Sequence, residues 1–252
     1  MRRLRAIPND LAWFLGLGGG SRVISKLESF RGVHQGGRCF IMGNGPSLAS
    51  MDLGPLEEEI TFGLNRIYLN FERMGFQSTY FVCMNELVLE QSAREIAALS
   101  MPRFLNWNRR RLFPPLEEIL FLRESYRPHF SRDLTEGIWG GATVTFAALQ
   151  VAYYMGFQEA ILIGVDHRYE AQGTPHSVVV SSGDESSHFA PDYFPEGFRW
   201  QLPDLRTSEI AYWMARKAFE QDGRRILDAT VGGALQVFPK ADYETLAGRV
   251  NA

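Results

Sequence analysis

The sequence predicts an α/β fold, with a mostly parallel sheet, helices on both faces and one long lid segment. Short apolar runs typical of buried strands alternate with helical segments along most of the chain. Strands that are apolar throughout are characteristic of a parallel sheet covered on both sides. A polar stretch rich in glycine, serine and aromatic residues, about residues 170–203, interrupts this alternation and predicts the lid.

Length, charge and cysteine content narrow the class of protein. The 252 residues suffice for one large domain, and the net charge of −3 argues against nucleic-acid binding driven by bulk charge. Cys39 and Cys83 both lie in apolar runs, so we expect reduced core residues of a cytoplasmic protein. No run reaches the roughly 18 apolar residues that a membrane span needs.

The N-terminus differs from the rest of the chain. Residues 1–35 predict a helical lead-in, and residues 36–252 a single domain. A basic start is followed by a short apolar run, Leu11 to Leu17, with no convincing cleavage site. Residues 1–17 therefore predict either an amphipathic segment resting on the inner face of the membrane or a plain packing helix.

The elements that follow are read from periodicity. A nearly all-apolar segment at 141–155 predicts a buried helix, and 208–221 an amphipathic one that stops before Gly223. Strands are predicted where short apolar runs occur, at 38–42, 60–64, 78–84, 119–122, 160–165, 225–227 and 235–238.

A glycine-rich turn, Gly43-Asn44-Gly45-Pro46-Ser47-Leu48, follows the first predicted strand. Its two glycines permit close approach of a ligand, and Pro46 suits the first turn of a helix. A strand, a turn and a helix start would point free N–H groups at a phosphate. An ordinary tight turn is the alternative. The turn lacks the third glycine of the dinucleotide-binding pattern.

Polar residues end four of the predicted strands: Asn44, Asn65, Asn85 and Asp166. Ligands of open parallel sheets bind at these carboxyl ends. Neutral amides suit a base, a ribose or a sugar, and a carboxylate could bind hydroxyls or a metal. Turn formation is the commoner reason for asparagine and aspartate at such positions.

The lid carries His176 and His188, and a lid histidine can act as a general base or acid because its pKa lies near working pH. A surface histidine is the alternative for both. The cysteines and histidines do not have zinc spacing, and the sequence contains neither a P-loop nor the G-x-S-x-G nucleophile elbow.

Together these motifs resemble a known superfamily. Gly43 to Leu48 is similar to the G-N-G-P-S-L of bacterial sialyltransferases that use CMP-sialic acid. It is also similar to the G-x-G-P-S-L of the 6-hydroxymethylpterin diphosphokinase-like proteins, which include the flagellin motility accessory factors. Asn65 and Asn85 match strand-end asparagines of the sialyltransferases, and residues 156–166 match the G-[YF]-x-x-I-x-L-x-G-x-D of both groups.

Downstream motifs resemble the diphosphokinase-like group more closely. Gly140-Gly141-Ala142-Thr143-Val144 is similar to its G-G-[ST]-V helix start. Residues 187–194 are similar to its S-H-F-x-x-[DN]-Y-[FY], and residues 228–235 to its N-A-[ST]-x-G-G-x-L.

The resemblance implies a Rossmann-like nucleotide-binding fold. Its implied nucleotide ligands are Gly43, Asn44, Gly45, Ser47, Asn65, Asn85, Gly141 and Thr143. The sialyltransferase relation implies His188 as base without a metal, with lid tyrosines, Tyr193 and Tyr169, helping the phosphate leave. The candidate catalytic residues are therefore His188, Asp166 and Tyr193. The G-H-S-type setting of the sialyltransferase base is absent here. The diphosphokinase relation instead implies ATP, with Asp166 and Asp192 binding Mg²⁺.

Three functions follow as alternatives. The first is a glycosyltransferase for surface polysaccharide synthesis, which takes a CMP-activated sugar and a glycan acceptor and has no tightly bound cofactor. The second is a Mg-ATP diphosphokinase acting on a small alcohol. The third is a non-catalytic nucleotide-binding protein. A homo-oligomer and peripheral membrane contact are left open, and nucleic acid is not expected as a partner.

Overall fold

The computed structural model describes residues 11, 13–15, 19–169, 173–183 and 187–248. It confirms the predicted α/β, Rossmann-like fold. Seven parallel strands are hydrogen-bonded in the order β11-β8-β1-β2-β3-β4-β5. The strands are β1 (Arg38–Met42), β2 (Thr61–Leu64), β3 (Tyr80–Cys83), β4 (Arg103–Asn106), β5 (Ile119–Leu122), β8 (Glu159–Ile163) and β11 (Arg225–Asp228).

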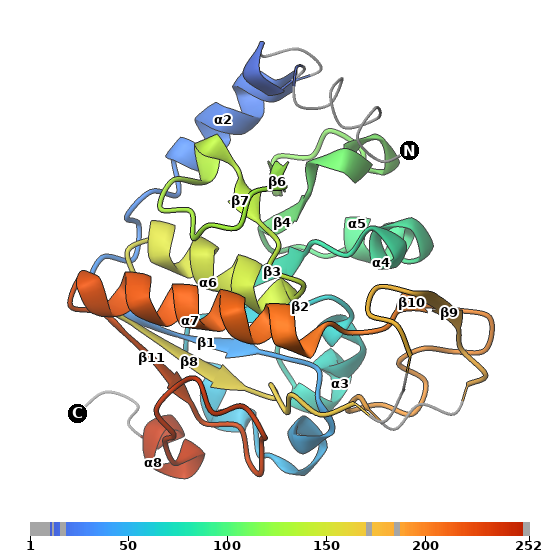
Figure 1. Ribbon diagram of the computed structural model, residues 1–252, viewed down its shortest axis with the longest axis vertical. Coiled ribbons are helices and arrows are strands. Elements are labelled where there is room, and N and C mark those ends of the chain that lie inside the picture. Colours follow the sequence, from blue (N-terminus) through green and yellow to red (C-terminus); the bar gives the residue numbers. More distant parts are fainter. Residues whose placement is uncertain (1–10, 12, 16–18, 170–172, 184–186, 249–252) are drawn as a thin grey trace.

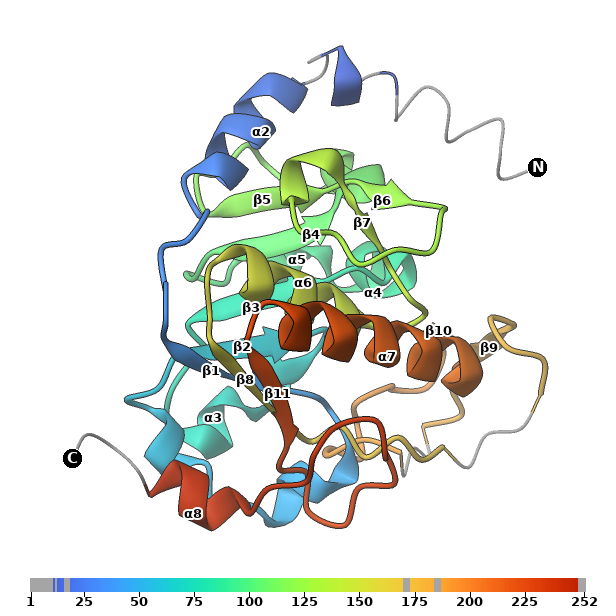
Figure 2. The same ribbon diagram turned by 60° about the vertical axis from the view of Figure 1, so that its left-hand side comes forward.

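Helices cover both faces of this sheet (Figures 1 and 2). The long helices α6 (Val144–Tyr154) and α7 (Leu205–Gln221) pack on one face, and α2 (Gly20–Glu28) extends the same apolar core towards β5. The second core lies on the opposite face. It involves α3 (Phe71–Met74), α4 (Glu86–Gln91), α5 (Ala93–Ala97) and α8 (Tyr243–Ala247). As predicted, α6 is buried on nearly every side.

One predicted strand is absent from the described structure, and one strand of the structure was not predicted. Residues 235–238 do not form a strand, although Leu235, Val237 and Phe238 are buried in the core. Conversely, β4 was not predicted, because its short run begins with a charged residue, Arg103. The structure buries Arg103 to 1% exposure, and its guanidinium pairs with Glu118 and donates to main-chain carbonyls near the end of α5.

The predicted lid has secondary structure of its own. The strands β9 (Val178–Val180) and β10 (Arg199–Gln201) form an antiparallel hairpin. The side chain of Gln91 in α4 bonds both the N–H and the carbonyl of Arg199, so the hairpin rests on that helix. Phe194 and Phe198 are buried in the second core. A further pair of short strands, β6 (Glu124–Ser125) and β7 (Ile138–Trp139), lies beyond β5.

The predicted membrane-contact segment, residues 1–17, lies mostly outside the described residues. Of its described part, Trp13 is buried at 1% exposure, whereas Leu11, Phe14 and Leu15 are exposed. The Trp13 ring packs edge-on against Trp107, with ring centroids 5.3 Å apart, and its indole N–H donates to the carbonyl of Thr135. Within the described ranges, no helix combines the length and the apolar character needed to cross a bilayer.

Candidate functional site

The strand order reverses between β1 and β8. From β1 the chain steps outward through β2, β3 and β4 to β5, and then returns to β8 on the other side of β1. The crevice outside the carboxyl ends of strands at such a reversal is where ligands of open α/β sheets bind. The glycine-rich turn after β1 and Asp166 after β8 lie at this point, so the fold brings together residues that are far apart in sequence.

The glycines of the turn allow β1 and β8 to end in close contact. A Cβ added to Gly43 would lie 2.2 Å from the carbonyl oxygen of Gly164, and one added to Gly45 would lie 1.8 Å from Oδ2 of Asp166. Both distances are far inside van der Waals contact. The two glycines are therefore required by packing between two loops, whatever ligand binds there.

The turn does not offer the row of free N–H groups that the sequence predicted. The N–H of Gly45 donates to the Gly164 carbonyl at 2.9 Å, and that of Ser47 to Oδ1 of Asp166 at 3.1 Å. A helix does begin at Pro46, as expected, but Pro46–Ser50 is a single short 3₁₀ helix. The Asp166 carboxylate occupies the start of this turn, where it also accepts from the Ser47 hydroxyl at 2.7 Å.

Two carboxamide oxygens at the edge of the sheet are buried without a hydrogen-bond partner among the described residues. They are Oδ1 of Asn44 and Oδ1 of Asn65. Nδ2 of Asn44 donates to the carbonyl of Leu64 at 3.0 Å, which holds the Asn44 amide beside the end of β2. Asn65 has a left-handed backbone, with φ of 48°. Unpaired buried acceptors are costly, and a hydroxyl or amino group of a ligand would satisfy them.

The structure shows a helix-capping role for Asn85. Its Oδ1 accepts from the N–H groups of Leu87 and Val88, at 2.9 and 3.2 Å, and so caps α4. This is the turn-forming role that asparagine commonly has at such positions. Contact between Asn85 and a nucleotide stays a prediction.

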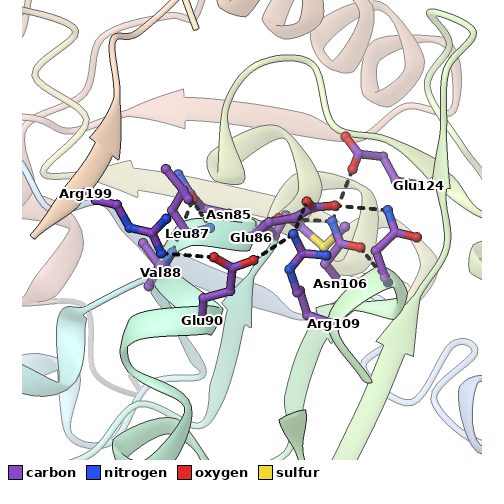
Figure 3. A network of polar contacts seen from close by, with 11 residues as sticks. Asn85, Glu86, Leu87, Val88, Glu90, Asn106, Arg109, Glu124 and Arg199 are labelled. Atoms are coloured by element: carbon purple, nitrogen blue, oxygen red, sulfur yellow. Dashed lines mark hydrogen bonds and ion pairs between the residues drawn. The ribbon is translucent and has the colours of Figure 1, made fainter. Parts of the chain in front are cut away.

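A further strand-end asparagine, Asn106, lies beside Asn85 and was missed. It is fully buried at the end of β4, and its Nδ2 donates to the Met84 carbonyl and to Glu124, both at 3.1 Å. Figure 3 shows the polar network around it, in which Arg109 pairs with Glu86 and Glu90. The sequence does contain a signal for Asn106, namely the apolar pair before it, because each of the other strand-end polar residues also follows an apolar run.

Gly141 and Thr143 precede α6, and Thr143 is the N-cap of this helix. The hydroxyl of Thr143 caps the helix by accepting from the N–H of Thr145, and lies 3.2 Å from the Tyr212 hydroxyl. Gly141 has φ of 58°, and a Cβ there would meet the Ala211 side chain at 2.6 Å. Packing and helix capping therefore explain both residues without a ligand. Their contact with a nucleotide stays a prediction.

The lid histidine lies next to the strand ends. The His188 ring stacks on Tyr193 with centroids 3.9 Å apart and planes 3° from parallel. The main-chain N–H of Phe189 donates to the Asn44 carbonyl at 3.0 Å, which fixes this part of the lid to the glycine-rich turn. His188 is therefore the sequence neighbour of a residue that is hydrogen-bonded to the site. His176, in contrast, is exposed and pairs with Asp204 at the start of α7.

The two lid tyrosines have different environments. Tyr193 is buried, and desolvation raises the pKa of its phenol well above the usual value. Its hydroxyl accepts from the N–H of Arg66 at 3.4 Å. Tyr169 is 41% exposed, with its ring 6.3 Å from that of His188. In this arrangement Tyr193 supports the histidine by stacking, and a role for either tyrosine towards a phosphate stays a prediction.

The predicted magnesium ligands are not joined in the structure. Asp166 is half-buried and bonded to Ser47 through both carboxylate oxygens, whereas Asp192 is exposed on the lid. Over the described part of the chain, no group of three histidine, cysteine or acidic side chains is arranged to hold a metal ion.

A surface hollow lies at the opposite edge of the sheet, among Arg38, Glu159 and Arg225. Glu159 pairs with Arg225, and Arg38 with Glu59, so these charges are compensated within the protein. We place the site at the carboxyl edge instead, because the unpaired acceptors and the strand-order reversal coincide there.

Comparison with known proteins supports the same fold. The chain is similar to the solved structure of the MAf glycosyltransferase from Magnetospirillum magneticum AMB-1, with a TM-score of 0.52 and 14% sequence identity. The similarity covers 91% of this chain but 38% of that chain, so this chain spans well under half of its length. No protein-family model matches the sequence, and no curated protein is similar to it.

At this level of identity the likeness shows the fold alone. It agrees with the sequence resemblance to motility accessory factors, whereas the relation to sialyltransferases and the choice of nucleotide stay predictions.

Proposed function

We propose that this chain is a nucleotide-dependent glycosyltransferase that uses a CMP-activated sugar and contributes to surface glycan synthesis. The observation that carries the proposal is the pair of carboxamide oxygens on Asn44 and Asn65, which have no partner among the described residues. They are buried at the carboxyl ends of β1 and β2, next to the strand-order reversal and the lid segment that carries His188. Oxygen acceptors suit the hydroxyl and amino groups of a nucleoside. The solved glycosyltransferase of the same fold adds support.

In this proposal His188 takes the proton from the acceptor hydroxyl. As the acceptor oxygen attacks the sugar carbon, the bond from that carbon to the phosphate breaks, and the nucleotide leaves with the bonding electrons. Stacking against Tyr193 holds the imidazole plane, so the base is oriented before the acceptor arrives. The neutral amides at the strand ends bind the nucleoside and orient it.

The diphosphokinase alternative is less well supported by the site. Transfer of diphosphate from ATP needs a metal and several N–H donors around the phosphates. Here the turn N–H groups of Gly45 and Ser47 already donate within the protein, and Asp166 adds a negative charge. Because of this internal bonding, we favour the metal-free transferase.

A thermal-shift panel tests the proposal. CMP and CDP should raise the melting temperature without Mg²⁺, because a ligand that binds only the folded state stabilises it. ATP should have no larger effect when Mg²⁺ is added. Stabilisation by ATP that requires Mg²⁺, with release of AMP, would support the diphosphokinase instead. No response to any nucleotide would contradict the nucleotide site itself.

The role of His188 has its own test. With a donor and acceptor in hand, His188→Ala should lower kcat by about 100-fold or more, the usual contribution of a general base. Binding of CMP should be nearly unchanged, since the proposed base contacts the acceptor. Full turnover by His188→Ala would show that the base lies elsewhere.

A further inference from the structure

Arg66, the residue after Asn65, is a buried cation that has no opposite charge beside it in the described part of the chain. Four charged side chains are buried within the described ranges: Arg66, Arg103, Glu159 and Asp228. Arg103 pairs with Glu118, Glu159 with Arg225, and Asp228 with Lys240. Arg66 has no carboxylate partner among the described residues, although only 8% of this residue is exposed to solvent.

The bonds that Arg66 does make involve only part of its guanidinium group. Nε donates to the Tyr68 hydroxyl at 3.2 Å, and Nη1 donates to the main-chain carbonyl of Tyr193. The charge also lies over the Phe198 ring, 4.8 Å from its centroid. Nη2, which carries two N–H groups, has no hydrogen bond to the described residues. One side of the guanidinium is therefore available to a ligand.

The position of Arg66 is the second part of the argument. Its main-chain N–H and its side chain both reach Tyr193, whose ring stacks on His188. Its neighbour Asn65 carries one of the two unpaired oxygens. The uncompensated charge therefore lies between the carboxyl end of β2 and the lid, at the edge of the proposed nucleoside site. A buried charge is stable only when an opposite charge or strong hydrogen bonds compensate it.

We propose that Arg66 binds the phosphate of the nucleotide through Nη2. A guanidinium N–H donates a charge-assisted bond to a phosphate oxygen, and such bonds are stronger than bonds between neutral groups. This assignment rests on the proposed nucleotide site, and it supplies the positive charge that the glycine-rich turn lacks. In this proposal the phosphate is bound by Arg66, which follows Asn65 at the end of β2. The glycine-rich turn after β1 does not bind it.

Calorimetric titration with CMP and with cytidine, which differ by the phosphate alone, tests the proposal. In Arg66→Gln the affinity for CMP should fall by about 10- to 100-fold, as expected for the loss of a charge-assisted bond, while that for cytidine is unchanged. Arg94→Gln is the matched control, since it removes one exposed arginine from α5. Its affinities for CMP and for cytidine should equal those of the native protein.

Two results would overturn the proposal. An unchanged CMP affinity in Arg66→Gln would show that the phosphate does not contact Arg66. Equal losses for CMP and cytidine would show that Arg66 only holds the lid in place. If Arg66→Gln does not fold, Arg66→Lys keeps the charge but not the planar guanidinium that places Nη2, and should lose about tenfold in CMP affinity with cytidine unchanged.

Inorganic phosphate separates this proposal from the proposed function. At matched ionic strength, phosphate should raise the melting temperature of the native protein relative to chloride, and should not do so in Arg66→Gln. If nucleotides do not bind but this phosphate effect is seen, the transferase proposal fails and the anion site stands. If phosphate has no effect and CMP binds no more tightly than cytidine, the Arg66 site is wrong.

Discussion

Asn65 combines two features that stability alone would not favour. Its backbone is left-handed, and its carboxamide oxygen is buried without a partner in the described structure. Asparagine tolerates this backbone better than most residues, but glycine adopts it without strain. In the proposed function, a ligand that donates to this oxygen satisfies it.

Replacing Asn65 separates binding from stability. Asn65→Gly relieves the left-handed strain and removes the unpaired oxygen, although it adds entropy to the unfolded chain. We therefore expect the free energy of unfolding to stay within about 1 kcal/mol of the native value. CMP affinity should fall by about tenfold. Urea unfolding and calorimetric titration measure the two quantities.

Asn85 provides the contrast, because its oxygen already caps α4. Asn85→Ala should lower the free energy of unfolding by about 1 kcal/mol. If Asn65→Gly were destabilised as much and still bound CMP normally, the role given to the Asn65 oxygen would be wrong.

Among the elements, the contact between the two loops after β1 and β8 is the most constrained. Gly45 has φ of −68°, a value that other residues also adopt. A substitution there would therefore cause no backbone strain, and its cost would come from steric overlap. A Cβ would overlap Asp166 and approach the Gly164 carbonyl to 2.9 Å. The loop pair must therefore move apart to accept any side chain.

Gly45→Ala should therefore destabilise the protein by about 3 kcal/mol, the upper part of the range for overpacking. Gly54→Ala is the matched control, because a Cβ there would meet only the Asp52 side chain, at 3.2 Å. Chemical denaturation of both variants measures the difference. Equal stabilities would contradict the close packing of the two loops.

The start of α7 gives a prediction that depends on pH. Oδ1 of Asp204 accepts from the N–H of Thr207 at 2.9 Å, and this bond is the main cause of the lowered pKa of the Asp204 carboxyl. A carboxyl whose pKa is lower in the folded protein stabilises it above the unfolded pKa. That contribution is lost as the pH falls through the folded pKa.

Asp204→Ala should lower the free energy of unfolding by about 1 kcal/mol at pH 7. The difference from the native protein should shrink as the pH falls below about 4, the ordinary aspartate pKa. Urea unfolding at several pH values measures it. A difference that is independent of pH would show that the ionised carboxylate is not what stabilises the helix start.

At the scale of the whole molecule, the N-terminal segment packs on the same core as the sheet. Trp13 and Leu27 of the predicted lead-in are buried in the core that α6 and β4 also form. The sequence predicts a separate lead-in up to residue 35. Composition can indicate that a segment differs from the rest of the chain, but not which parts of the chain the segment contacts.

Trp13→Ala tests how far this segment is part of the domain. The variant should lose about 3 kcal/mol of unfolding free energy, because it empties a buried site the size of an indole. Leu15→Ala, at a side chain that is 61% exposed, should change it by less than about 0.5 kcal/mol. Equal, small effects would indicate that residues before α2 pack only loosely on the domain.

Local patterns gave good predictions where one element is regular. The run Ala160 to Val165 predicts a strand because its residues are apolar on both faces, and β8 is the buried neighbour of β1. The missed strand β4 shows the limit of this reasoning. Arg103 looks polar in the sequence, and only the carbonyls around α5 together with Glu118 explain how its charge can be buried.

The sequence by itself determined the alternation of strands and helices, the position of the glycine-rich turn and the polar residues that end the strands. These are local properties, because the period of apolar residues and the backbone freedom of glycine act over a few residues. The tertiary structure decided which of these groups are already bonded. It alone shows that the N–H groups of Gly45 and Ser47 donate within the protein. It also shows that, among the described residues, two asparagine oxygens lack a hydrogen-bond partner and the buried Arg66 lacks a counter-charge. Hydrogen bonds and burial depend on segments far apart in the chain: Ser47 and Asp166 are 119 positions apart, and Arg66 and Tyr193 are 127 apart. No local pattern contains such contacts.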